Sequence, residues 1–91
     1  GYGKVLGRPG LGLAVRELCI VALLAVADAP TQLYSHLRGA LNVGAPSGAV
    51  EEALALAAEV SGPGPRRRAS EAWARVAARR GGGPGRSGRD T

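Results

Sequence analysis

Alanine dominates the apolar residues of this chain. Of its 91 residues, 17 are alanine and none is phenylalanine or methionine, and the aromatic residues are Tyr2, Tyr34 and Trp73. Alanine has the highest helix propensity, but it contributes little apolar area when it is buried. We therefore expect a helical chain with a thin core, which gains further burial by assembling into a homo-oligomer.

Glycine and proline divide the chain into four helical segments. The first runs from about residue 13 to 27 as a buried helix, and the second begins near Pro30 and ends at Gly44. Ser47 is the expected N-cap of the third helix, and the fourth covers about residues 66–80 after a glycine and proline break at 61–65. Because no stretch alternates apolar and polar residues as a strand does, the predicted class is all-α.

Helical spacing predicts the buried face of each later segment. The second helix carries a stripe of leucine and alanine at i, i+4, i+7 and i+8. The third and fourth helices repeat small apolar residues at similar intervals. The predicted core residues are Leu33, Leu37, Ala40 and Leu41, then Val50, Ala53, Leu54, Ala57 and Ala58, then Ala69, Ala72, Trp73, Val76 and Ala77.

Positive charge gathers in the last third of the sequence. Residues 1–60 carry four basic and five acidic groups, whereas residues 61–91 carry eight arginines and two acidic groups. With few aromatic residues and no nucleic-acid motif, we expect a solvated basic helix face and no nucleic-acid partner; binding of phosphates or anionic lipid is the alternative. We expect residues 1–80 to form one domain and the glycine-rich tail 81–91 to be disordered.

The single cysteine and the hydropathy pattern exclude other classes. Cys19 alone cannot form an internal disulfide, and we expect it to be a buried structural thiol. The longest apolar run, residues 18–27, is ten residues, short of the roughly 20 that span a membrane. Arg16 and Glu17 precede this run, which does not fit a signal peptide, so we expect a soluble cytoplasmic protein.

Three polar residues could carry chemistry. Glu17 lies on the first helix among apolar residues, while Gln32 and His36 are four residues apart on the second helix and share a face. One interpretation is a structural polar cluster that holds two helices in register. The other is an acid–base site, because a carboxylate beside an imidazole can support proton transfer near neutral pH.

The order of these residues resembles a known family. R-E-L at residues 16–18, Gln32-Leu33, and the string H-L-R-G-A-L-N at residues 36–42 followed by Gly44 are similar to the carboxymuconolactone decarboxylase family, which includes the AhpD-like proteins. The resemblance covers about residues 2–60. It implies an all-α fold built on a helical hairpin, assembled as a trimer, hexamer or similar ring with sites near subunit interfaces.

The resemblance also implies a type of activity. Peroxidase members carry two cysteines at positions that here are Ala29 and Gln32, so we do not expect thiol peroxidase activity. The remaining branch is similar to cofactor-independent decarboxylases of a small unsaturated lactone acid. On that reading His36 is the general acid–base, Glu17 tunes it or relays protons to it, and Gln32 orients His36 or the substrate. Arg38 pairs with a substrate carboxylate or forms a salt bridge.

These considerations leave two hypotheses. The first is an oligomeric decarboxylase-like enzyme that uses His36 and Glu17 on a small-molecule substrate and needs no metal or cofactor. The second is a non-catalytic oligomeric module of the same fold, in which those residues only stabilise the helix packing. Substitution of His36 by glutamine separates the two hypotheses, because it abolishes turnover in the first and lowers the melting temperature in the second.

Overall fold

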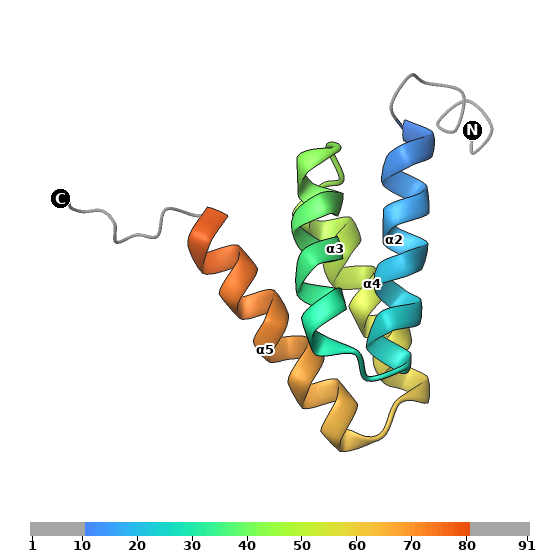
Figure 1. Cartoon of the computed structure of the whole chain (residues 1–91). Coiled ribbons are helices and arrows are strands. Elements are labelled where there is room, and N and C mark those ends of the chain that lie inside the picture. Colours follow the sequence, from blue (N-terminus) through green and yellow to red (C-terminus); the bar gives the residue numbers. More distant parts are fainter. Residues whose placement is uncertain (1–10, 81–91) are drawn as a thin grey trace, which may run out of the picture.

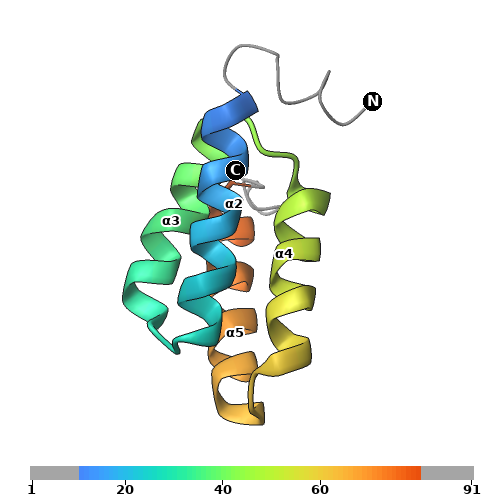
Figure 2. The ribbon, with the colours of Figure 1, turned by 90° about the vertical axis from the view of Figure 1, so that its right-hand side faces the viewer.

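A computed structural model describes residues 11–80, which form four α-helices and no strand. They are α2 (Leu11–Val26), α3 (Pro30–Asn42), α4 (Ser47–Val60) and α5 (Pro63–Arg80). In the view of Figure 2, α3 and α4 flank α2 and α5 lies behind them, whereas Figure 1 shows α5 beside α3. The predicted all-α class is confirmed for this part of the chain. The predictions for the segment before residue 11 and for the tail 81–91 fall outside the described residues.

A tight turn joins α2 to α3 as a helical hairpin. The amide of Asp28 donates to the carbonyl of Ala25, and the amide of Ala29 donates to that of Leu24. This pair of bonds is a Schellman motif, which needs a left-handed residue directly after the helix. Asp28 takes that conformation with φ of 59°, and aspartate tolerates it better than most residues. Helix α3 then begins at Pro30, as predicted.

A second Schellman motif closes α3. The amide of Gly44 donates to the carbonyl of Leu41, and the amide of Ala45 donates to that of Ala40. Gly44 has φ of +98°, a conformation that glycine adopts without a steric cost. The glycine predicted to end this helix therefore occupies the left-handed position that the motif requires.

Two predicted helix starts are wrong. Ser47 is not the N-cap of α4 but its first residue; Pro46 is the cap, and no side chain caps the helix. Helix α5 begins at Pro63 rather than near Arg66. The reason is that the first turn of a helix leaves its amides without intrahelical partners, so Pro63 and Pro65 fit there and do not break the chain.

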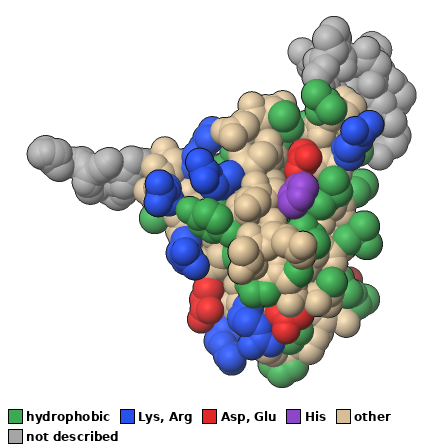
Figure 3. All heavy atoms as spheres, viewed as in Figure 1, with side chains coloured by type: hydrophobic (Ala, Val, Ile, Leu, Met, Phe, Trp, Pro, Cys, Tyr) green, Lys and Arg blue, Asp and Glu red, His purple; other side chains and the backbone are tan. Residues whose placement is uncertain are grey.

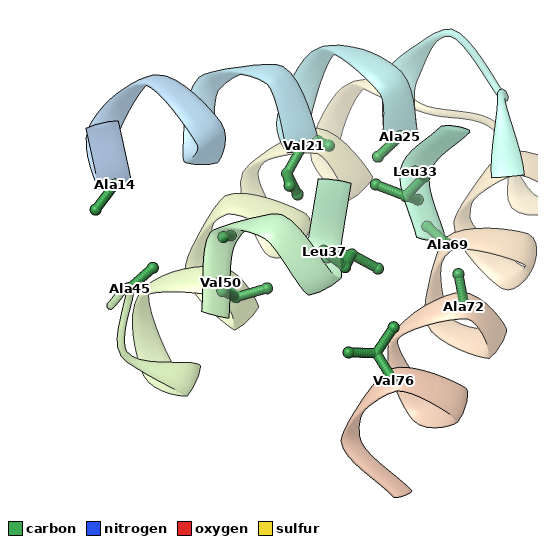
Figure 4. Close-up of a cluster of buried hydrophobic side chains, with 12 residues drawn as sticks. Ala14, Val21, Ala25, Leu33, Leu37, Ala45, Val50, Ala69, Ala72 and Val76 are labelled. Carbon is green, nitrogen blue, oxygen red and sulfur yellow. The ribbon is translucent and has the colours of Figure 1, made fainter. Parts of the chain in front are cut away.

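The core lies between all four helices and is built from small side chains (Figure 4). Leu33, Leu37 and Val21 are its largest fully buried members. Most predicted core positions are buried or partly buried, but Ala77 is exposed. The buried residues are Ala14, Val21, Ala25, Leu33, Leu37, Ala40, Ala45, Val50, Ala57, Ala69, Ala72 and Val76.

Helix α2 is buried on one side only, which corrects the expectation of a fully buried helix. Leu23 is 68% exposed, and Leu13 and Val26 are also exposed. The physical reason is that α3 and α4 flank α2 and α5 lies behind it, so no described helix covers its remaining side (Figure 2). Hydrophobic side chains consequently line the outer edge of α2 (Figure 3).

Candidate functional site

Glu17 and His36 meet between the two helices of the hairpin. Glu17 lies on α2 and His36 on α3, and Nδ1 of the imidazole is 2.8 Å from Oε1 of the carboxylate. Since a carboxylate can only accept, Nδ1 carries the proton of this hydrogen bond. The contact leaves Nε2 as the ring nitrogen that can exchange a proton with another molecule.

The pair lies at the surface rather than in the core. The side chain of His36 is 38% exposed and that of Glu17 is 22% exposed. Figure 3 shows the histidine, the single one in the sequence, at the surface beside an acidic side chain. Although Glu17 lies among apolar residues in the sequence, its carboxylate reaches the rim of the core and not its centre.

Gly39 allows the carboxylate of Glu17 to approach the backbone of α3. Gly39 is one turn after His36, and a Cβ atom added to it would lie 3.5 Å from Oε1 of Glu17. The carboxylate thus rests close to the α3 backbone with no side chain between them. On α2, Leu13 and Ile20 are four residues before and three after Glu17, so they share its side of the helix and border the pair with apolar surface.

The other two predicted site residues lie apart from each other. Gln32 is exposed and one turn before His36 on the same side of α3. Arg38 follows His36 by two residues, which turns it about 200° around the helix, away from the Glu17–His36 pair. Arg38 instead faces α5, where it lines a hollow with Arg79 and Arg80.

Cys19 is exposed, which contradicts the expectation of a buried thiol. It is two residues after Glu17 on α2, so it faces away from His36 by the same helical geometry. The expectation came from its apolar neighbours, but Leu18 and Val21 face the core, whereas Cys19 shares the exposed side of α2 with Leu23, one turn later. Among residues 11–80, no group of three or more histidine, cysteine, aspartate or glutamate side chains could hold a metal ion.

Sequence reasoning missed a cleft of about 360 Å³ between α4 and α5. Trp73 forms part of its wall, and its indole Nε1 donates to Oε2 of Glu51 at 3.2 Å. Arg66 lies at the same cleft and donates to the carbonyl of Ala58 at 2.9 Å. No spacing signal in the sequence links two residues on different helices, so only the packing of α4 against α5 reveals this cleft.

One comparison with known proteins identifies the family of this chain. The model of the carboxymuconolactone decarboxylase family matches residues 1–76. This chain belongs to that family. No curated protein and no solved structure matches it. The match covers most of the sequence, so the predicted family is confirmed.

The match to the carboxymuconolactone decarboxylase family includes nearly all of the described helices. The family match extends over α2, α3, α4 and most of α5. Within residues 11–80, no helix has the length and apolar character needed to cross a membrane. The Glu17–His36 pair is accordingly a candidate site on the surface of a helical family member.

Proposed function

We propose that this chain is a cofactor-independent decarboxylase of a small unsaturated lactone or related organic acid. The observation that carries the proposal is the 2.8 Å contact between Nδ1 of His36 and Oε1 of Glu17. It fixes the imidazole and orients Nε2 outward, which is the arrangement a general acid–base requires. The family match supports the substrate class.

The proposed reaction needs one proton donor. Cleavage of the bond between the substrate carbon and its carboxylate releases carbon dioxide, and the electron pair delocalises into the lactone carbonyl. His36 then gives the proton on Nε2 to the carbon, and solvent returns a proton to the ring. Glu17 stabilises the imidazolium form by its hydrogen bond, and Gln32, one turn away, orients the substrate or His36.

A second copy of the chain would complete this site. The pair is open to solvent, whereas decarboxylation intermediates need protection from water. On the side of α2 that carries Glu17, Leu13 is exposed and Ile20 is partly exposed. A homo-oligomer that buries this side of α2 would enclose the substrate pocket and exclude water from it.

The test follows the ultraviolet absorbance of 4-carboxymuconolactone with the full chain. We expect turnover by the wild type and a loss of about 10²–10⁴-fold in kcat for His36→Gln, the usual contribution of a general acid. Glu17→Gln should lose less, because the imidazole remains. The control is Arg67→Gln, a substitution at an exposed position of α5, which should keep full activity.

Two results would contradict the proposal. Full turnover by His36→Gln would remove His36 from the mechanism. Absence of turnover in the wild type would exclude the namesake reaction, and a lowered melting temperature of His36→Gln would then support the non-catalytic module.

A further inference from the structure

Three arginines, one from α3 and two from the last turn of α5, line one hollow. The hollow measures about 170 Å³, and its walls are Arg38, Val76, Arg79 and Arg80. Helix α5 diverges from α3 towards its C-terminal end (Figure 1), and basic side chains gather over this part of the molecule (Figure 3). Because Arg38 faces away from the Glu17–His36 pair, this hollow is separate from the candidate active site.

No carboxylate of the described residues neutralises these three charges. Helix α3 has no acidic residue, and the one acidic residue of α5, Glu71, precedes Arg79 by more than two turns. The ion pairs formed within residues 11–80 join His36 to Glu17 and Arg68 to Asp28, and none includes the three arginines. Like charges therefore face one hollow without a counter-charge in this part of the chain.

One of the arginines is held in place by a neutral group. Nη1 of Arg80 donates to Oδ1 of Asn42, at the end of α3, at 2.6 Å. This bond fixes the guanidinium without removing its charge, so less side-chain entropy is lost when an anion binds. Arg75, one turn before Arg79, lies 5.0 Å over the ring of Tyr34 and adds further positive potential.

We propose that Arg38, Arg79 and Arg80 form a binding site for the phosphoryl group of a small molecule. The planar guanidinium binds phosphate oxygens through two parallel hydrogen bonds, and three such groups match a doubly charged anion better than a single carboxylate. The hollow is smaller than the roughly 300 Å³ of a pocket that encloses a drug-sized ligand, so it takes the charged group and leaves the rest of the molecule outside.

An alternative role for two of these residues is local to α5. Arg79 and Arg80 lie in its last turn, where positive charge stabilises a helix C-terminus without any ligand. Arg38 belongs to a different helix, so that role does not explain it. The decisive variant is therefore Arg38→Gln.

The experiment measures the Kd of inorganic pyrophosphate for the full chain by isothermal titration calorimetry at fixed ionic strength. We expect Arg38→Gln and Arg79→Gln each to weaken binding at least about tenfold, because each removes charge-assisted hydrogen bonds. The matched control is Arg67→Gln, which removes the same charge from the exposed face of α5 and lines none of the hollow. It should change Kd by less than about twofold. His36→Gln should bind as tightly as the wild type, which keeps this site distinct from the proposed active site.

Three outcomes would overturn the proposal. Equal weakening by Arg67→Gln and Arg38→Gln would show a general effect of net charge. Absence of binding at millimolar pyrophosphate would show that the hollow holds no phosphoryl group. Tighter binding of a short single-stranded oligonucleotide than of pyrophosphate, lost in the same variants, would assign the arginines to a nucleic-acid backbone instead.

Discussion

Asp28 shows how one residue serves both a backbone turn and an ion pair. Its left-handed conformation closes α2, while its carboxylate accepts two hydrogen bonds from Arg68 of α5 at 2.8 and 2.7 Å. These hydrogen bonds are the main reason why the pKa of Asp28 lies below its usual value. The positive charge of Arg68 lowers this pKa further, whereas desolvation of the carboxyl raises it. The bidentate pair ties the α2–α3 turn to α5, a long-range link between segments 40 residues apart in sequence.

The ion pair between Asp28 and Arg68 should make the stability of the fold depend on pH. A carboxyl whose pKa is lower in the folded state stabilises the fold above its unfolded pKa, about 3.9 for aspartate, and loses this effect as pH falls through the folded pKa. Asp28→Asn keeps a residue that tolerates positive φ but removes the charge. Melting temperatures should therefore be lower for Asp28→Asn than for the wild type at pH 7, and the gap should narrow below about pH 4.

A double-mutant cycle with Arg68→Gln provides the control. Once Arg68 is absent, Asp28→Asn should lower the melting temperature much less, because the two residues act through one interaction. A gap between wild type and Asp28→Asn that stays constant from pH 7 to pH 3 would contradict the role of the ion pair.

At the scale of the element, two Schellman motifs shape the bundle. One turns the chain from α2 into α3, and the other carries it from α3 towards α4. Their left-handed positions are held by Asp28 and Gly44, so the chain uses two different residues for the same backbone requirement. The hairpin that brings Glu17 to His36 depends on the first of these turns.

Two glycine substitutions should change stability in opposite directions. Gly44→Ala places a Cβ in open space but in a left-handed backbone, which should lower the free energy of unfolding by about 1–2 kcal/mol. Gly48→Ala, in the first turn of α4 with nothing within 4 Å, should raise it by about 0.4–1 kcal/mol. Urea unfolding of both variants measures the difference, and changes of the same sign would refute this explanation.

At the scale of the whole molecule, apolar surface is left uncovered on the side formed by α2 and α4. These helices pack side by side (Figure 2). Each exposes large apolar side chains near its C-terminal end. Leu23 and Val26 of α2 are exposed, as are Leu56 and Val60 of α4, with Val60 at 74%. A core made largely of alanine and valine gains from burying this surface, so it supports the predicted homo-oligomer.

If the uncovered side is the oligomer interface, a charge placed on it should dissociate the oligomer. Leu23→Glu places a carboxylate at the centre of the exposed α2 face and should shift the mass in solution from an oligomer to the monomer. Ala74→Glu adds the same charge on an exposed position of α5 and should leave the oligomer intact. Sedimentation equilibrium distinguishes these states, and a wild type that is monomeric at micromolar concentration would exclude the predicted oligomer.

The helical class and the family could be predicted from the sequence, and the resemblance to that family implied the helical hairpin. Alanine content, proline and glycine positions and the H-L-R-G-A-L-N string act locally, within one or two helical turns, so they can be read without knowing which helices touch. The same local periodicity placed Leu33, Leu37 and Ala40 in the core. It also placed Gln32 and His36 on one side of α3.

Tertiary structure alone decided which polar groups meet across helices. Helical periodicity gives the direction of a side chain but not its neighbour, so it could nominate Glu17 and His36 without giving their 2.8 Å contact. It also could not join Asp28 to Arg68 or show that Cys19 is exposed. Each of these depends on how α5 and α4 pack against the hairpin, because only that packing determines which side of α2 and α3 is covered.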